Sequence, residues 1–242
     1  LIFLKYPNEL KDLEPDMEGG LNGFFAGYVP GMLNGPYPDG TGKWVPKGSE
    51  FVFQMHYTTT GRPASDISKL GLYLSKKKPA REFFTRAATN IDFEIKPNDP
   101  RSPTSATYAF DRDVVLYEMA PHMHFRGKEV SYEVKYPDGK LETLLNVPNY
   151  DFNWQTMYKL DKPLRLPAGS ELYVAGAFDN SARNPRNPDP AKTVYFGDQS
   201  WDEMFIGYIG YTYVNPDEAS AKLAEVSIHL GKPVTVENLI GT

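Results

Sequence analysis

The sequence predicts an all-β protein, built as two antiparallel β-sandwich domains in tandem. Aromatic residues make up 14% of the 242 residues, with 16 tyrosines, and this enrichment favours strands over helices. The chain also contains 20 glycines and 21 prolines, which place turns between short apolar segments. Many short strands separated by regular turns are typical of a sandwich or a barrel.

Short segments with strand character recur along the whole chain. In residues 129–136 apolar and polar side chains alternate, and the sequence Pro-Asp-Gly-Lys at residues 137–140 closes a hairpin. A helix is expected only at residues 216–226, with Asn215 as its N-cap. The segments that we expect to form strands are 1–6, 51–57, 70–74, 88–95, 105–110, 113–119, 129–136, 158–160, 171–178, 194–196 and 204–214.

An internal similarity suggests that the two domains are related. Residues 45–51 (Val-Pro-Lys-Gly-Ser-Glu-Phe) resemble residues 166–172 (Leu-Pro-Ala-Gly-Ser-Glu-Leu), and each segment leads into an apolar strand. The alternative is that Pro-x-Gly is simply a common turn before a strand. We predict an N-terminal domain over residues 1–85 and a C-terminal domain over residues 86–242.

Composition excludes several classes of partner and site. The net charge of −5 is spread along the chain without a basic stripe, so nucleic acid is not an expected partner. The absence of cysteine excludes disulfides, thiolate zinc sites and a blue-copper centre. No apolar run is long enough to span a bilayer, and no signal peptide is visible.

The first residues, Leu1 to Tyr6, have the character of a strand already in progress, without an initiator methionine. We therefore expect the natural N-terminus to lie upstream, where any export signal and further domains would also be.

Three side chains form the candidate metal site. His122 and His124 flank Met123 in strand-like sequence, and residues i and i+2 of a strand point to the same face, so both imidazoles can reach one ion. Met204 is the candidate third ligand, because a thioether is a soft donor that suits Cu(I) better than zinc. The alternatives are a core-filling methionine and two hydrogen-bonded histidines, since short motifs are unspecific.

These residues belong to an ordered set that resembles a known family. The set comprises residues 53–57 (Phe-Gln-Met-His-Tyr), 120–124 (Ala-Pro-His-Met-His) and 200–204 (Ser-Trp-Asp-Glu-Met). In order and spacing it is similar to the copper type II, ascorbate-dependent monooxygenases, the group of peptidylglycine α-hydroxylating monooxygenase and dopamine β-monooxygenase. The resemblance extends from about residue 19 to residue 214.

The resemblance implies a fold and a set of ligands. It implies two jelly-roll-like sandwich domains with one copper in each. His122, His124 and Met204 match the ligands of the second-domain copper, which activates O₂ beside the substrate. His56 matches the last of three histidines that hold the electron-delivering copper of the first domain, and Gln54 matches a glutamine that faces the cleft between the coppers.

The departures from the family pattern also matter. The other two histidines of the first-domain site would precede Leu1, so a second copper near His56 is expected only if upstream histidines exist. Peptide-amidating members hold a substrate carboxylate with an arginine where this chain has Ala120, and have an asparagine where it has Ile206. Tyr208, in contrast, is retained as a candidate catalytic residue. A C-terminal glycine substrate is therefore disfavoured, and the lack of cysteine suggests a bacterial relative.

The function implied by the resemblance is copper-dependent hydroxylation of a C–H bond in a small substrate, using O₂ and ascorbate or another electron donor. His122, His124, Met204, Tyr208 and Gln54 are then the candidate catalytic residues. The alternatives are a copper-binding or structural sandwich module without turnover, within a larger exported protein, and a metal-free adhesion domain. The family resemblance implies a periplasmic or extracellular location, with an electron-donor protein as a further possible partner.

Overall fold

The computed structural model describes residues 1–13, 17, 21–29, 32, 35–57 and 60–215, and the prediction of an all-β protein is confirmed. Apart from one 3-10 helix, η1 (Asn8–Leu13), the regular elements of the described residues are strands. All strand pairs but one are antiparallel, as predicted; the exception is the short pair β3 (Thr41–Gly42) and β5 (Arg81–Glu82).

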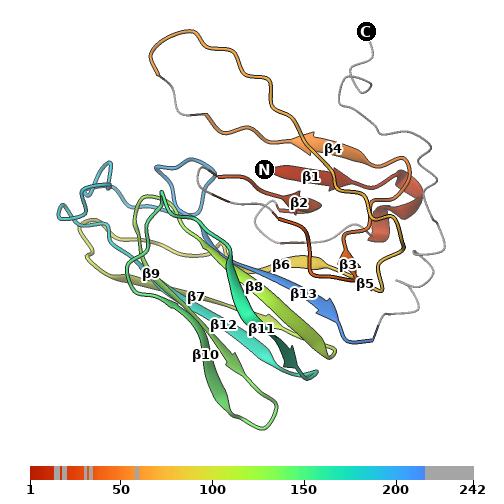
Figure 1. Cartoon of the computed structure of the whole chain (residues 1–242). Coiled ribbons are helices and arrows are strands. Elements are labelled where there is room, and N and C mark those ends of the chain that lie inside the picture. The colour runs from red at the N-terminus through yellow and green to blue at the C-terminus, as the bar shows by residue number, and fades with distance from the viewer. Residues whose placement is uncertain (14–16, 18–20, 30–31, 33–34, 58–59, 216–242) are drawn as a thin grey trace.

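A sandwich of two four-stranded sheets forms the C-terminal part of the structure (Figure 1). The first sheet has the order β10-β9-β12-β7 and the second the order β11-β8-β13-β6. Their strands are β6 (Phe84–Asn90), β7 (Ser102–Ala109), β8 (Val114–His122), β9 (Gly127–Lys135), β10 (Leu141–Val147), β11 (Tyr158–Leu166), β12 (Glu171–Phe178) and β13 (Phe205–Tyr213).

Alternation along the strands explains why the two sheets pack on each other. In β9, Val130, Tyr132 and Val134 are buried between the sheets, whereas the residues between them are partly exposed. The predicted hairpin between β9 and β10 is present, and Gly139 occupies its turn at a φ of 86°. A residue other than glycine would be strained in this left-handed conformation.

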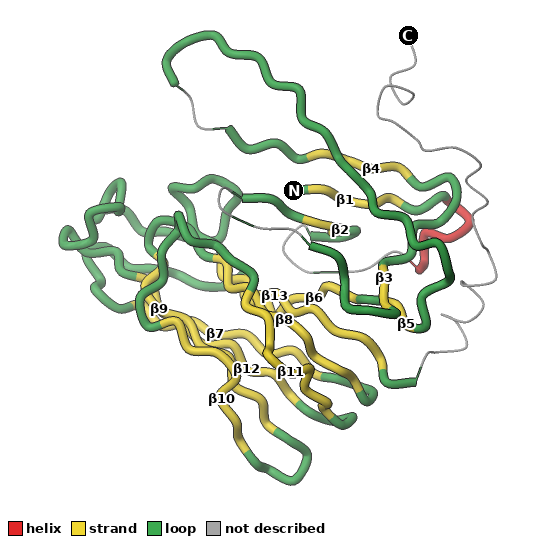
Figure 2. The backbone as a smooth tube through the Cα atoms, in the orientation of Figure 1, coloured by secondary structure: helices red, strands yellow, loops and turns green. Residues whose placement is uncertain are grey.

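A smaller sheet lies on the outer face of the sandwich, beside β6, β13 and β8 (Figures 1 and 2). It has the order β2-β1-β4, with β1 (Ile2–Lys5), β2 (Phe24–Ala26) and β4 (Glu50–Phe53). The buried residues Met17, Leu21 and Ile206 form an apolar cluster between this sheet and β13. β6 starts at Phe84 and belongs to the sandwich. The chain therefore enters the sandwich close to the predicted domain boundary at residue 85. The division into two domains stays a prediction.

Several predicted boundaries are wrong. The strand expected at residues 51–57 ends at Phe53, and residues 70–74 form no strand. Residues 194–196 contribute only isolated bridges, because Val194 pairs with Ile95 and Phe196 with Glu203. The helix expected at residues 216–226 lies outside the described residues. No helix in the described part of the chain is both long and apolar enough to cross a membrane.

Candidate metal centre

The strand pair β8 and β13 brings two distant parts of the chain together. In their register the Cα of Ile206 is opposite that of His122, and Tyr208 is opposite Ala120. Residues of one strand alternate between faces, and Phe205 and Ile209 point into the core between the sheets, so Ile206 and Tyr208 point outward. His122 lies opposite Ile206 and therefore shares this outer face.

The two histidines lie next to each other on that face. Their ring centroids are 5.1 Å apart, and the rings are nearly perpendicular. Met123, between them, is fully buried in the core of the sandwich. β8 ends at His122, so His124 lies just beyond the strand, yet the alternation of side chains continues through it. Both imidazoles can thus approach one ion.

Met204 lies on the same face as the histidines. It immediately precedes β13, and the register that pairs Ile206 with His122 would, if continued by two residues, place Met204 opposite His124. Its side chain packs against the apolar cluster of Met17, Leu21 and Ile206, which is the outward side of the sheet. The structure therefore places Met204 on the face of the sheet that carries the two histidines.

Both imidazoles are hydrogen-bonded through Nδ1. Nδ1 of His122 lies 2.6 Å from Oε1 of Gln155, and Nδ1 of His124 lies 3.3 Å from the backbone oxygen of Asp202. An amide or backbone oxygen can only accept, so each Nδ1 must donate its proton, and the ring of His124 is also hydrogen-bonded to the backbone of Gln199. Nε2 of His122 then carries the lone pair, which is the arrangement typical of a metal-binding histidine whose other nitrogen is hydrogen-bonded.

The environment also keeps the imidazoles uncharged. Burial and, to a smaller extent, the neighbouring His124 lower the pKa of His122 to about 4. Burial likewise lowers the pKa of His124 to about 4. Since only a neutral imidazole binds a metal ion, both side chains are ready to do so at ordinary pH.

The remaining predicted site residues lie around this pair. His56 is exposed, three residues beyond the end of β4, and its charge contributes to lowering the pKa of both His122 and His124. Gln54 exchanges two backbone hydrogen bonds with Leu1, at 2.8 and 2.9 Å. Tyr208 is stacked on Phe24 of β2, with ring centroids 5.2 Å apart, and burial raises its pKa.

The sequence of this part of the chain matches a known family. The profile of the copper type II ascorbate-dependent monooxygenase C-terminal domain matches residues 102–229, more than half of the chain. The chain belongs to this family. The matched region contains His122, His124 and Met204, and the resemblance predicted from the motifs is confirmed at the level of the family.

Other comparisons add little to the family assignment. A search among curated proteins finds no match. Among solved structures, the chain is similar to a structure of infectious bursal disease virus Gt strain (10% identity, TM-score 0.30, 68% of this chain and 41% of that one) and to a T13 particle of the same virus (11%, 0.28, 70% and 39%). A ruminal GH26 endo-beta-1,4-mannanase gives 14% identity and a TM-score of 0.22, over 66% of this chain and 24% of that one. The chain spans less than half the length of these proteins.

The donor set fits the copper of this monooxygenase family. Within the described ranges, no three His, Cys, Asp or Glu side chains gather in a group that could hold a metal. The face that carries His122 and His124 instead offers two neutral nitrogens and the thioether of Met204. Imidazole suits copper, and a thioether favours Cu(I), so these donors are compatible with a copper ion that changes between its two oxidation states.

Two residues that the motifs did not reveal hold the backbone around the histidines. The carboxyl group of Glu203 accepts hydrogen bonds from the backbone N–H of His124 (2.8 Å) and of Arg126 (2.6 Å). The hydroxyl of Tyr150 accepts from the backbone N–H of Met123 (3.0 Å) and donates to the carbonyl of the same residue (2.8 Å). Of the two, Glu203 belongs to the Ser-Trp-Asp-Glu-Met motif at residues 200–204, but the motif did not indicate this structural role, and Tyr150 belongs to none of the motifs.

A third such residue, Gln155, lies in the loop between β10 and β11. Its side-chain nitrogen donates to the carbonyl of Phe152 at 2.9 Å, which orients the amide oxygen toward His122. The ring of Phe152 in turn lies edge-to-face with that of His124, at 6.1 Å. Nothing in the sequence indicated that this loop, about 30 residues after the histidines, would cover them.

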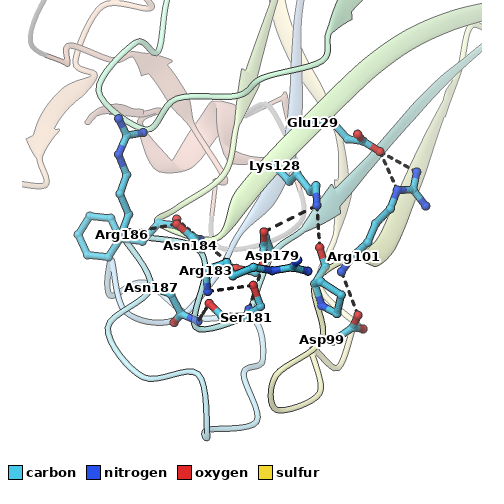
Figure 3. A network of polar contacts seen from close by, with 12 residues as sticks. Asp99, Arg101, Lys128, Glu129, Asp179, Ser181, Arg183, Asn184, Arg186 and Asn187 are labelled. Atoms are coloured by element: carbon cyan, nitrogen blue, oxygen red, sulfur yellow. Dashed lines mark hydrogen bonds and ion pairs between the residues drawn. The ribbon is translucent and has the colours of Figure 1, made fainter.

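The loop after β12 is ordered by its own polar contacts (Figure 3). Asp179 accepts from the backbone N–H of Ser181 at 2.9 Å and forms an ion pair with Lys128 at 3.7 Å. Asn180 is fully buried and accepts a hydrogen bond from the guanidinium of Arg126 at 2.8 Å. The loop therefore holds the side chain of Arg126, whose backbone N–H donates to Glu203.

Proposed function

We propose that this chain is the substrate-side part of a copper monooxygenase that hydroxylates a C–H bond of a small molecule, with O₂ and an external electron donor. A copper ion held by His122, His124 and Met204 supplies the one-electron redox chemistry that such a reaction needs. The observation that supports the proposal is that the two imidazoles lie side by side on the outer face of the sheet, where Met204 packs against the apolar cluster that contains Ile206.

The chain's own residues prepare this face for a metal ion. Nδ1 of His122 donates a hydrogen bond to Gln155, and Nδ1 of His124 donates one to the carbonyl of Asp202, which orients both rings and leaves Nε2 of His122 as the nitrogen with a lone pair. Burial keeps both rings neutral. The thioether of Met204 favours the reduced ion, which is the state that reacts with O₂ in this family.

The surroundings of the site favour an uncharged substrate group. Ala120 and Ile206 lie on the same outer face as the histidines, at the positions where peptide-amidating members have an arginine and an asparagine. Tyr208, opposite Ala120, adds a stacked aromatic ring to the same surface. None of Ala120, Ile206 and Tyr208 carries a cation that could pair with a carboxylate, so we propose a substrate that lacks one at the reacting end.

A second function is a copper-binding module without turnover. It differs from the enzyme in lacking the electron-delivering copper, for which His56 is the candidate ligand in this sequence. The number of copper ions bound per chain distinguishes the two functions. Two ions per chain of the full-length protein support the enzyme, and one supports the module.

A copper titration tests the site itself. We expect the wild-type chain to bind copper, and His122→Ala and Met204→Ala to remove or weaken that binding. Tyr136→Phe, in the hairpin of β9 and β10, serves as a control, because it leaves the three proposed ligands and His56 intact. Unchanged stoichiometry and affinity in both His122→Ala and Met204→Ala would rule out this site, and with it the proposed function.

A further inference from the structure

The proposed ligands His124 and Met204 lie outside the regular hydrogen bonding of the sheet. β8 ends at His122 and β13 begins at Phe205, so the ladder between the two strands stops before it reaches either residue. Backbone N–H groups just beyond a strand lose their partners in the ladder, and they cost free energy when they are buried without a replacement. The groups that accept hydrogen bonds from these backbone N–H groups therefore decide how firmly His124 and Met204 are held.

Side chains replace the missing ladder bonds. The N–H groups of Met123, His124 and Arg126 donate to Tyr150 Oη, Glu203 Oε2 and Glu203 Oε1, at 3.0, 2.8 and 2.6 Å. Glu203 is fully buried and Tyr150 nearly so, which shields these hydrogen bonds from water. Three amides within four residues are thus held by two buried side chains.

Glu203 connects the two proposed ligands because of its position in the sequence. Glu203 is the residue directly before Met204, so its carboxyl group joins the backbone of one proposed ligand to that of another, His124. Arg126 strengthens the same connection in the opposite direction, since its guanidinium donates to the carbonyl of Trp201 at 2.8 Å. The segments 123–126 and 201–204 are therefore tied together in both directions.

We propose that Glu203 and Tyr150 are positioning residues that fix His124 and Met204 in their relative places before a metal binds. The inference rests on the proposed function for the identity of the ligands, but the hydrogen bonds themselves are independent of any metal. Preorganised ligands lose less conformational freedom on binding, so the clamp formed by Glu203 and Tyr150 raises the affinity for copper.

Two conservative variants test the clamp. Glu203→Gln keeps the shape of the side chain but replaces one acceptor oxygen by an NH₂ group, so one of the two N–H donors loses its partner. Tyr150→Phe keeps the ring and removes the hydroxyl that is hydrogen-bonded to the backbone N–H and carbonyl of Met123. Matched controls lie in the distant hairpin of β9 and β10, where the hydroxyl of Tyr136 donates to Glu142 at 3.0 Å. Tyr136→Phe removes this hydrogen bond, and Glu142→Gln makes the same substitution as Glu203→Gln far from the proposed ligands.

The first measurement is copper affinity, by competition with a chelator, together with the Cu(II) electron paramagnetic resonance spectrum. We expect each clamp variant to bind copper about 10- to 100-fold more weakly, as is typical when residues that orient metal ligands are replaced. The spectrum should change as well, whereas both controls should match the wild type. If Glu203→Gln does not fold, Tyr150→Phe alone decides, and an affinity within twofold of the wild type with an unchanged spectrum would overturn the proposal.

The second measurement is amide hydrogen exchange of the metal-free protein, which separates this proposal from the proposed function. In the wild type the amides of Met123, His124 and Arg126 should be protected, and the clamp variants should exchange them faster while β12 stays unchanged. Equal exchange in wild type and variants would overturn the clamp even if copper binds. A wild type that binds no copper would instead refute the proposed ligand set, and the exchange data would still decide on the clamp.

Discussion

The side-chain oxygen of Gln155 accepts a hydrogen bond from Nδ1 of His122 at 2.6 Å, although the two residues are 33 positions apart in the sequence. Its amide nitrogen donates a hydrogen bond to the carbonyl of Phe152, so the side-chain amide cannot flip by 180° without losing this second hydrogen bond. This relationship determines which nitrogen of His122 faces the outer surface of the sheet, and it leads to the first prediction.

Replacing Gln155 by alanine should lower the affinity for copper by about tenfold, because His122 would no longer be held in the tautomer with a free Nε2. The measurement is a chelator competition titration of the purified chain. Asn153→Ala, two residues away in the same loop and exposed, should bind copper like the wild type. Equal affinities for all three proteins would show that Gln155 does not orient the ring.

Met204→Leu should weaken Cu(I) binding more than Cu(II) binding, since leucine preserves the packing of the apolar cluster but has no sulfur. Separate titrations with the two oxidation states measure the difference. Met119→Leu is the control, because Met119 lies on the opposite face of the same sheet and is buried in the core. An equal loss for both ions would contradict a thioether ligand.

Phe24→Ala should lower the free energy of unfolding by about 1–3 kcal/mol, measured by urea denaturation. The aromatic ring of this half-buried residue stacks on Tyr208, and its removal leaves a gap between the N-terminal sheet and β13. Tyr28→Ala removes a ring of similar size that is 67% exposed, and it should change the stability by about 0.5 kcal/mol or less. If both variants lose the same stability, the N-terminal sheet is not held by this stack.

Gly207→Ala should destabilise the sandwich by about 1–3 kcal/mol through overpacking. A Cβ at this position of β13 would lie 2.8 Å from Cγ2 of Val174 and 3.2 Å from the hydroxyl of Tyr132, both on the facing sheet. Gly71→Ala provides the comparison, because a Cβ there meets no atom within 4 Å. Thermal melting of the two variants should show a clear loss for the first and little change for the second.

Lys43 is a partly buried cation between the N-terminal sheet and the sandwich. Its ammonium group donates to the carbonyl of Phe25 and lies 5.2 Å from the centre of that ring, and 6.0 Å from the rings of Phe24 and Tyr37. Burial lowers its pKa to about 7, and the charge of Arg86 acts in the same direction, whereas Glu118 and Glu82 oppose the shift.

The lowered pKa of Lys43 predicts how stability changes with pH. Between pH 7 and the ordinary value of 10.5, the unfolded chain binds a proton that the folded chain does not, so stability rises with pH. The free energy of unfolding of the wild type should therefore increase relative to that of Lys43→Met from pH 7 to pH 10. Glu82, whose pKa burial raises to about 7, acts in the range from pH 4.5 to 7 and in the opposite direction. A difference between the two proteins that stays constant above pH 7 would contradict a neutral Lys43.

The sequence by itself determined the all-β class, most strands of the sandwich and the family. These properties follow from local patterns: alternation such as that of Val130, Tyr132 and Val134 selects strands, and Gly139 fits the turn between β9 and β10. The His-x-His spacing could likewise be interpreted locally, because neighbouring strand residues separated by one position share a face.

The tertiary structure decided what surrounds the proposed ligands. The hydrogen bonds of Gln155 to His122, of Glu203 to His124 and of Tyr150 to Met123 join segments that are 27 to 79 residues apart. Such contacts depend on the register of β8 with β13 and on the path of the loop before β11, and no short pattern encodes either.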